Sequence, residues 1–256
     1  MSRPKALVLR AAGTNCQHET ERALRLAGAD ASVLYLGRLL EEPQRLDEVE
    51  ILVLAGGFSY GDDVAAGRVW GLELRHGLAE ALQAYVDRGG HALGVCNGFQ
   101  VLVESGLFDS NGVDGARDIA LTNNESNHYE CRWVELEEMD CACPWIVPGA
   151  TMPTPVAHAE GRFVVKDDAT LAKLIERRQI ALRYVAEGYP ANPNGSIANI
   201  AGICDPTGRV LGLMPHPERN LDPWQHPQWG RLGERSEGEG LSFYRRLVEC
   251  AAGQPA

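Results

Sequence analysis

A cysteine, a histidine and a glutamate stand in two short motifs whose spacing suits attack on an amide. The segment 94–98 reads Gly-Val-Cys-Asn-Gly and centres on Cys96, and the segment 214–218 reads Met-Pro-His-Pro-Glu and contains His216 and Glu218. A thiolate that attacks an amide needs a base or acid beside it and a third group that orients this base. These three side chains therefore predict a nucleophilic cysteine centre.

The Cys96 motif has the form of a nucleophile elbow, in which the nucleophile stands between two glycines where a strand turns into a helix. Side chains at Gly94 and Gly98 would crowd the nucleophile, and the turn places the sulfur near a helix N-terminus, which favours the thiolate. The alternative is a buried structural cysteine beside an ordinary turn. Cys16 also follows a strand and a glycine turn, but His18 stands where a second glycine is needed, so we interpret Cys16 as structural.

His216 and Glu218 follow an apolar run, and the flanking prolines restrict their backbone. In an extended segment residues i and i+2 point the same way, so we expect Glu218 to accept a hydrogen bond from one ring nitrogen of His216. The other ring nitrogen then faces Cys96. A histidine two residues before a glutamate is a weak signal by itself, and the elbow cysteine elsewhere in the chain is what favours catalysis.

A glycine pair, Gly56 and Gly57, supplies the third requirement, which is backbone N–H donors for a developing oxyanion. The pair follows another apolar run and lies at the same sheet edge as Cys96 if the strands are parallel. The amide of Asn97, the residue after the nucleophile, is the expected other donor. The alternative is a plain glycine-rich connection, and the segment has no G-x-G-x-x-G spacing or P-loop lysine that would indicate a nucleotide site.

The elements around these motifs alternate between apolar runs and amphipathic segments, as in a parallel sheet covered on both faces. Expected strands are 5–10, 31–36, 51–55, 92–95, 131–136, 162–165, 180–185, 197–204 and 210–214. Expected helices run from the turn at 13–15 to about Leu26, over 70–88, onward from Phe99, and over 241–251. The turn at 204–208 predicts an antiparallel hairpin. We expect one α/β domain over residues 5–252, a mostly parallel open sheet flanked by helices, with added antiparallel strands in the second half.

The composition argues against nucleic-acid-binding, membrane-spanning and secreted proteins. The 256 residues carry 24 Lys and Arg against 35 Asp and Glu, a net charge of −11 with no basic cluster, which argues against a nucleic-acid partner. No apolar run approaches the ~20 residues of a membrane span, and no secretory segment is evident. Seven cysteines, an odd number, are typical of a chain in a reducing compartment. We therefore expect a cytoplasmic protein without membrane or nucleic-acid partners.

Taken together, the motifs resemble class I, triad-type glutamine amidotransferases, and most closely the glutaminase subunits of phosphoribosylformylglycinamidine synthases. The motifs are Gly-Thr-Asn-Cys (13–16), Gly-Gly-Phe-Ser-Tyr-Gly-Asp (56–62), Gly-Val-Cys-Asn-Gly-Phe-Gln (94–100), Glu-Cys-Arg-Trp-Val (130–134), His-Ala-Glu-Gly-Arg-Phe (158–163), Asn-Pro-Asn-Gly-Ser (192–196) and Met-Pro-His-Pro-Glu-Arg (214–219). The resemblance covers the chain from its first strand to residue 220, and the combination is specific although each piece alone is modest. It implies the flavodoxin-like fold of this family.

The resemblance implies a two-step reaction in purine biosynthesis. Cys96, assisted by His216 and Glu218, would attack the side-chain amide of glutamine, release ammonia and form a thioester that water hydrolyses to glutamate. The ammonia would pass to a large synthetase subunit that converts formylglycinamide ribonucleotide to formylglycinamidine ribonucleotide with ATP, often with a small third subunit. ATP and magnesium would belong to that partner, so no cofactor or metal is expected in this chain. Gln100 matches a family position that contacts glutamine, and the resemblance also implies that the amides of Gly57 (or Phe58) and Asn97 are the oxyanion donors.

Two segments depart from the family pattern. Residues 121–129 stand where the family has an Asn/Ser-rich segment near the substrate, but Asn123 and His128 are unusual there, so no contact residue is assigned. Asp62 and Asp63 are two adjacent acidic residues at a place where the family leads us to expect one. Neither departure touches the three residues of the triad.

Other interpretations remain open. A Cys-elbow glyoxalase, deglycase or peptidase would use the same architecture but would not need Gln100, and a non-catalytic amidotransferase-like scaffold would usually lack the nucleophile or the histidine. Cys131, Cys141 and Cys143 do not match a zinc spacing. Trp224 and Trp229 suggest a partner-binding surface. No role is expected for the remaining histidines, which are residues 18, 76, 91, 158 and 226.

Overall fold

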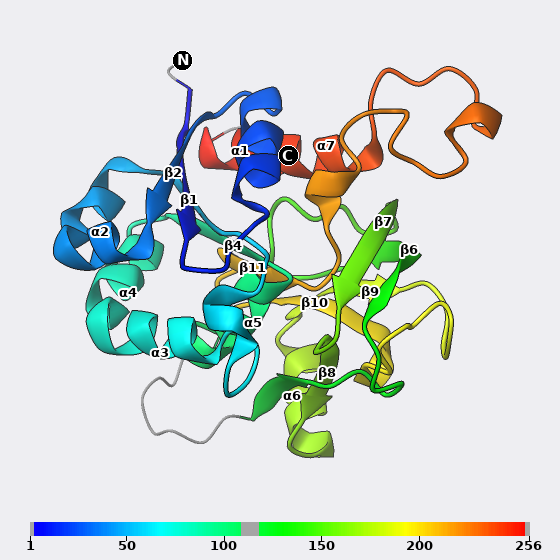
Figure 1. Cartoon of the computed structure of the whole chain (residues 1–256), viewed down its shortest axis with the longest axis horizontal. Coiled ribbons are helices and arrows are strands. Elements are labelled where there is room, and N and C mark those ends of the chain that lie inside the picture. The colour runs from blue at the N-terminus through cyan, green and yellow to red at the C-terminus, as the bar shows by residue number, and fades with distance from the viewer. Residues whose placement is uncertain (1–2, 109–117, 254–256) are drawn as a thin grey trace.

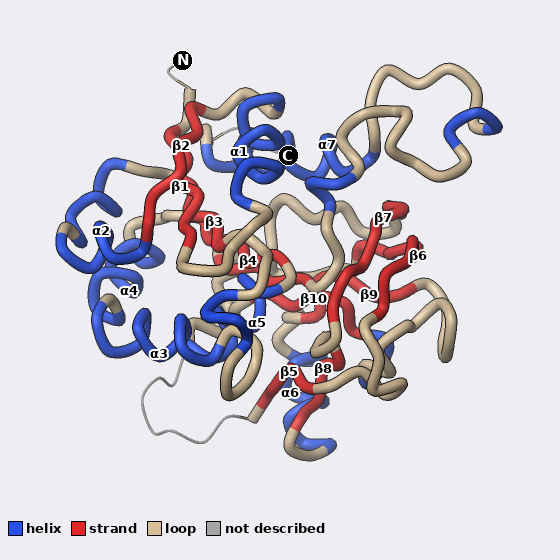
Figure 2. The backbone as a smooth tube through the Cα atoms, viewed as in Figure 1, coloured by secondary structure: helices blue, strands red, loops and turns tan. Residues whose placement is uncertain are grey.

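The computed structural model describes residues 3–108 and 118–253, and a nine-stranded mixed sheet runs through it (Figures 1 and 2). The strand order is β2-β1-β3-β4-β11-β10-β9-β6-β7. The first five strands of this order are parallel to one another, and each of the last four is antiparallel to its neighbour. A separate antiparallel pair joins β5 and β8. The predicted fold class, a parallel open sheet with antiparallel strands contributed by the second half, is confirmed.

The elements are as follows. The strands are β1 (Lys5–Arg10), β2 (Asp30–Tyr35), β3 (Ile51–Leu54), β4 (His91–Val95), β5 (Ile119–Thr122), β6 (Glu130–Glu138), β7 (Thr151–His158), β8 (Arg162–Val165), β9 (Ile180–Tyr184), β10 (Ile200–Cys204) and β11 (Val210–Leu213). The helices are α1 (Gln17–Leu26), α2 (Leu36–Glu41), α3 (Arg68–Gly77), α4 (Ala79–Asp87), α5 (Asn97–Ser105), α6 (Asp168–Glu176) and α7 (Glu239–Ala251).

Burial explains why the central strands are so apolar. Every residue of β3, β4 and β11 is buried, because helices cover both faces of the parallel part of the sheet. Helices α1 and α7 pack together on one side, and α3 and α5 pack together on the other (Figure 1). No helix of the described residues is long and apolar enough to cross a membrane.

Most of the expected strands are confirmed, as is the antiparallel hairpin that joins β10 to β11. The single helix expected over 70–88 is wrong. The chain forms α3 and α4 instead, because the backbone leaves the helical region at Leu78, where φ is −133°. The second half also contains β7 and α6, which were not expected.

The parallel topology brings the chemical motifs together. Strands β1, β3, β4 and β11 all point the same way, and each is followed by one of the motif loops. Carboxyl ends of parallel strands meet at one edge of a sheet, which is where ligands bind in open α/β sheets. Residues 13–16, 56–62, 96–100 and 214–219 therefore gather at this edge.

Candidate active site

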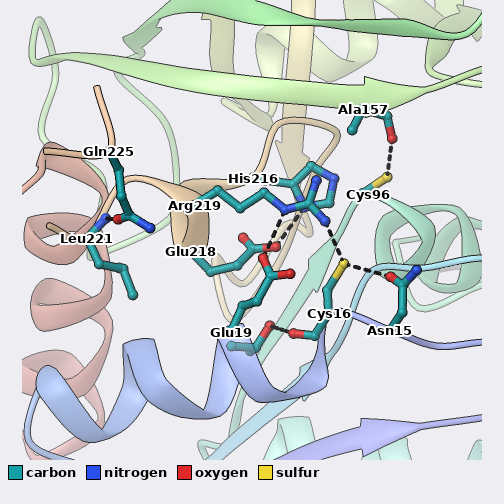
Figure 3. A network of polar contacts seen from close by, with 11 residues as sticks. Asn15, Cys16, Glu19, Cys96, Ala157, His216, Glu218, Arg219, Leu221 and Gln225 are labelled. Atoms are coloured by element: carbon teal, nitrogen blue, oxygen red, sulfur yellow. Dashed lines mark hydrogen bonds and ion pairs between the residues drawn. The ribbon is translucent and has the colours of Figure 1, made fainter. Parts of the chain in front are cut away.

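Cys96 occupies the strained turn that the elbow motif predicts. Its φ of +52° lies in the left-handed region that non-glycine residues seldom adopt. It follows β4 directly and α5 begins at the next residue, so the cysteine stands at the N-terminus of a helix. The residue is buried, and its Sγ atom lies 3.7 Å from the carbonyl oxygen of Ala157 on β7 (Figure 3).

The two flanking glycines are required for a reason other than the one expected. A Cβ atom at Gly98 would lie 1.9 Å from the carbonyl oxygen of Leu54 on β3, and one at Gly94 would lie 2.5 Å from the carbonyl oxygen of Gly98. The glycines therefore allow α5 to pack closely on the sheet. Among the closest contacts of either Cβ atom, none is to the nucleophile.

His216 and Glu218 form a buried ion pair, with 2.6 Å between His216 Nδ1 and Glu218 Oε1. The prediction that they share a face of an extended segment is wrong, because Pro217–Arg219 is a 3₁₀ turn, but the turn still brings the two side chains together. Burial alone would lower the pKa of His216. The negative charges of Glu218 and of the Cys96 thiolate outweigh it, so the pKa of His216 is raised.

Besides Glu218, the imidazole of His216 interacts with the side chain of Cys96, and its other ring nitrogen, Nε2, is buried. The Nε2 atom can therefore exchange a proton with the sulfur of Cys96 or with a leaving group. The structure thus brings Cys96, His216 and Glu218 into one site, as the motifs predicted.

The edge strand β7 holds the turn at 216–220 in place. The backbone carbonyl of Pro155 accepts a hydrogen bond from His216 N at 2.9 Å, and that of Pro153 accepts one from Asn220 Nδ2 at 2.8 Å. Ala157, two residues further along β7, has the carbonyl that faces Cys96. Alternate carbonyls of β7 thus contact Cys96 and the turn at 216–220. Sequence analysis missed this strand because two prolines interrupt it, although prolines are tolerated in an edge strand.

The expected oxyanion donors are distinguished by their hydrogen bonds. The amide of Phe58 donates to the carbonyl of Gly13 at 3.1 Å, so it is already engaged. The amides of Gly57 and Asn97 have no hydrogen-bond partner among the described residues. Gly57 also has φ +145°, and a Cβ atom there would lie 2.7 Å from Asn15 N. Of the two candidates in this loop, Gly57 is therefore the available donor.

The side chain of Asn97 connects the glycine loop, residues 56–62, to α5. Its Oδ1 accepts from Ser59 N at 3.2 Å, and its Nδ2 donates to Gln100 Oε1 at 3.0 Å and to Asp62 Oδ1 at 3.4 Å. Gln100 is buried, and its Nε2 donates to the backbone carbonyl of Glu160 at 2.5 Å. Gln100 therefore lies one helical turn beyond the nucleophile, at the wall of the same site.

Of the two adjacent acids at positions 62 and 63, Asp62 is the one that faces this side of the site. Burial and the nearby charge of Glu160 raise its pKa to about 6. Its neighbour Asp63 is exposed. The two acids that look alike in the sequence therefore have different surroundings.

A second cysteine lies in the site. Cys16, interpreted from the sequence as structural, is buried beside the His–Glu pair (Figure 3). Its thiol donates to Asn15 Oδ1 at 3.2 Å and accepts from Arg219 Nη2 at 3.0 Å. Burial and the charge of Glu218 raise the pKa of the Cys16 thiol well above its usual range. Cys16 is therefore a neutral thiol, unsuited to act as the nucleophile.

His158 is also part of the site's surroundings, although no role was expected for it. Burial and the neighbouring His216 lower the pKa of His158 to about 3, so its ring is neutral. Its Nε2 pairs with Asn194 Nδ2 at 3.2 Å, and the same amide nitrogen donates to the carbonyl of Gly161 and to the hydroxyl of Tyr184. The 158–163 and 192–196 motifs thus form one buried network behind the site.

Residues 121–129, in which no glutamine contact was predicted, divide into a buried, structural part and an exposed part. Asn124 is buried and bridges the backbone of His128, His158 and Gly161. Asn123 and His128 are exposed. Tyr129 is half exposed and stacks on Phe58, with ring centroids 6.3 Å apart. The pair of Phe58 and Tyr129 therefore lies at the rim of the site, at the glycine loop formed by residues 56–62.

One group of three potential metal ligands occurs among the described residues, formed by Cys16, His216 and Glu218. Their hydrogen bonds already account for this grouping, and the guanidinium of Arg219 on the Cys16 sulfur disfavours a cation there. Cys131, Cys141 and Cys143 belong to no such group in this part of the chain.

Comparisons with known proteins agree with this geometry. Residues 3–250 match the family model described as a CobB/CobQ-like glutamine amidotransferase domain. The chain is 39% identical over 258 residues to the phosphoribosylformylglycinamidine synthase subunit PurQ of Dehalococcoides mccartyi, with 98% of this chain and 99% of that one covered. The PurQ subunit of Methanococcus maripaludis is 41% identical over 245 residues, covering 93% of this chain and 90% of the other.

A solved structure extends the comparison to three dimensions. A chain of the structure of PurLQS from Thermotoga maritima superposes with a TM-score of 0.73 and 32% sequence identity. The match covers 97% of this chain and 99% of that one. The similarity thus extends over nearly the full length of both chains.

Proposed function

Because the chain belongs to the glutamine amidotransferase family, as a PurQ glutaminase subunit of phosphoribosylformylglycinamidine synthase, we propose that Cys96, His216 and Glu218 are its catalytic triad. The observation that carries the proposal is the buried 2.6 Å pair of His216 and Glu218 beside a cysteine at a helix N-terminus. Similarity to the relatives establishes that the chain is a glutaminase subunit of this family. The roles of its individual residues are what we propose.

In the first step the Cys96 thiolate attacks the side-chain carbonyl carbon of glutamine, and the amides of Gly57 and Asn97 stabilise the oxyanion. His216 donates a proton to the leaving nitrogen, ammonia departs, and a glutamyl thioester remains. In the second step His216 takes a proton from water as the water oxygen attacks the thioester carbon, and the C–S bond breaks to release glutamate and restore the Cys96 thiolate beside the charged His216. Glu218 orients the imidazole and stabilises its charged form. Gln100 contacts the bound glutamine.

The ammonia is used by a partner. The Thermotoga maritima structure is that of a PurLQS assembly, and we propose that this chain likewise joins a PurL synthetase and a small PurS subunit. The synthetase would aminate formylglycinamide ribonucleotide with ATP and magnesium. The exposed Trp224 and Trp229, which are 63% and 59% exposed, are the surface we expect the partner to cover.

We also propose that residues 5–252 form a single domain that works in the cytoplasm. One sheet that contains strands from both halves of the chain supports the first statement. Seven free cysteines support the second, because a reducing compartment preserves thiols. A glyoxalase, deglycase or non-catalytic scaffold receives no support from the relatives.

Covalent trapping tests the triad directly. The chain, assembled with its synthetase, is treated with a diazo-ketone analogue of glutamine, and the adduct is mapped by peptide mass spectrometry. We expect one adduct, on Cys96, that excess glutamine prevents and that His216→Ala slows by at least about 100-fold. The Cys16→Ser variant is the matched control and should be labelled as the unmodified chain is. An adduct on Cys16, or none in the assembled complex, would refute the assignment.

A further inference from the structure

Two free thiols meet at the end of the sheet opposite to the candidate active site. Cys204 is the last residue of β10, and β10 runs antiparallel to β11, whose carboxyl end leads to the turn at 216–220. Cys141 lies in the loop between β6 and β7. Neither cysteine has a part in the proposed glutaminase reaction, so chemistry at this pair would be a separate property of the chain.

The backbone of Arg178 brings the two cysteines together. Its carbonyl oxygen accepts a hydrogen bond from Ala142 N at 2.8 Å and another from the Cys204 thiol, with 3.7 Å to Sγ. The hairpin that follows Cys204 packs on the same loop, since a Cβ atom at Gly208 would lie 2.1 Å from the carbonyl oxygen of Ala142. The side chain of Cys141, the residue before Ala142, interacts directly with that of Cys204. Both thiols are free, and the fold makes them neighbours.

The two thiols differ in burial and in acidity. Cys204 is completely buried and Cys141 is partly exposed, so a solute reaches Cys141 first. The hydrogen bond from Cys204 lowers the pKa of Cys141 more than burial raises it, and the nearby charge of Arg178 lowers it further. The same hydrogen bond and burial raise the pKa of Cys204. Cys141 is therefore the thiol of the pair that ionises, which is the form that reacts with oxidants.

A third thiol in this loop is less suited to such chemistry. Cys143 is buried, and burial raises the pKa of its thiol well above the usual range. Its backbone carbonyl oxygen lies 4.0 Å from Sγ of Cys141. These cysteines belong to no group of three potential metal ligands in the part of the chain that the structure describes. The geometry therefore provides a pair of thiols and not a metal site.

We propose that Cys141 and Cys204 form an oxidisable dithiol, which hydrogen peroxide converts to an intramolecular disulfide. The thiolate sulfur of Cys141 attacks one peroxide oxygen, an S–O bond forms, the O–O bond breaks, and the departing hydroxide takes up a proton as water. The sulfur of Cys204 then attacks the sulfenic acid on Cys141. The S–S bond forms, the S–O bond breaks, and the second hydroxide leaves as water with the proton of Cys204. Two thiols are thus oxidised by two electrons, and one peroxide is reduced to two waters.

Oxidation of the reduced, folded full chain with an equimolar amount of hydrogen peroxide tests the proposal. The remaining thiols are blocked with N-ethylmaleimide, and unreduced peptides are mapped by mass spectrometry. We expect the chain to lose two of its seven thiols and two hydrogen atoms of mass, with one disulfide that joins the peptides of Cys141 and Cys204. A disulfide between Cys141 and Cys143, or oxidation confined to other thiols, would overturn the proposal.

Two serine variants separate the roles of the thiols. In Cys204→Ser the sulfenic acid on Cys141 has no thiol to react with, so dimedone, which labels sulfenic acids, should label Cys141. In Cys141→Ser the buried Cys204 should keep its free thiol. Cys131→Ser, which removes an exposed cysteine outside the pair, is the matched control and should form the disulfide at the unmodified rate. Dimedone on Cys131 instead of Cys141, or a control that forms the disulfide at least about tenfold more slowly, would show that exposure and not the pairing determines reactivity.

Discussion

At the scale of single residues, the sequence identifies the groups that we propose to act on the substrate but not the groups that surround them. Cys96, His216 and Glu218 are visible because each stands in a local motif. Arg219 meets Cys16 only because the chain returns to the same sheet edge some 200 residues later. Likewise, nothing local distinguishes His158 from an ordinary core histidine, since its neighbours Asn194 and His216 come from distant loops.

Asp62 provides a prediction at this scale. Its pKa is raised from 3.8 to about 6 on folding, so the folded chain binds more protons than the unfolded chain between these values. Stability from this group is therefore lost as pH rises through that interval. Asp62→Asn removes the ionisation and keeps an acceptor for Asn97. At pH 7 the variant should be more stable than the unmodified chain by about 1 kcal/mol, after allowance for solvent at a half-buried site.

Urea unfolding at a series of pH values measures this difference. It should shrink towards zero as the medium is acidified to the ordinary pKa of an aspartate. Asp63→Asn, at the exposed neighbour, is the control and should show no such trend. If Asp62→Asn is less stable than the unmodified chain at neutral pH, the prediction is wrong. The folded chain would then stabilise the carboxylate of Asp62 through a contact that asparagine cannot make.

At the scale of elements, the predictions succeeded where a pattern is strong and failed where tertiary context decides. Buried parallel strands such as β3 and β4 are continuous apolar runs, so they were predicted almost to the residue. Strand β7 was missed because Pro153 and Pro155 argue against a strand, and only its position at the sheet edge makes them acceptable. The α6 helix has a capping aspartate, Asp167, which accepts a hydrogen bond from Thr170 N, and such a cap is a local signal for the start of a helix.

The elbow helix gives a prediction at this scale. Gly98→Ala would place a Cβ atom 1.9 Å from the Leu54 carbonyl, so α5 must move away from β3. We expect a loss of about 3 kcal/mol in the free energy of unfolding and slower labelling of Cys96. Gly230→Ala is the control, because a Cβ atom there meets nothing within 4 Å. Equal stabilities of the two variants, from denaturant unfolding, would contradict the account of the glycines.

At the scale of the whole molecule, one loop stands apart from the body. Residues 222–237, between the turn at 216–220 and α7, project from the fold (Figure 1) and carry Trp224, Trp229 and Leu232, all exposed. An exposed aromatic group of this kind is typical of an interface. The position of the loop, directly after His216 and Glu218, would let a bound partner act on the triad.

Removing this apolar surface should weaken assembly. We expect Trp224→Ser with Trp229→Ser to raise the Kd for the synthetase subunit by at least about tenfold, since buried tryptophans are frequent interface hot spots. Isothermal titration with purified subunits measures it. Ile175→Ser on α6, which also removes an exposed apolar side chain, is the control. An unchanged Kd in the double variant would place the interface elsewhere.

The hydrogen bonds from the catalytic turn to β7 have a consequence beyond catalysis. An outermost strand offers unpaired backbone groups on which a strand of another molecule can add, and this is a common route to aggregation. In β7 two prolines remove donors from the edge, and the turn around His216 and Asn220 occupies the carbonyls of Pro155 and Pro153. The residues that hold the active site together therefore also protect the sheet from self-association. Substitutions that loosen this turn should make the protein less soluble as well as less active.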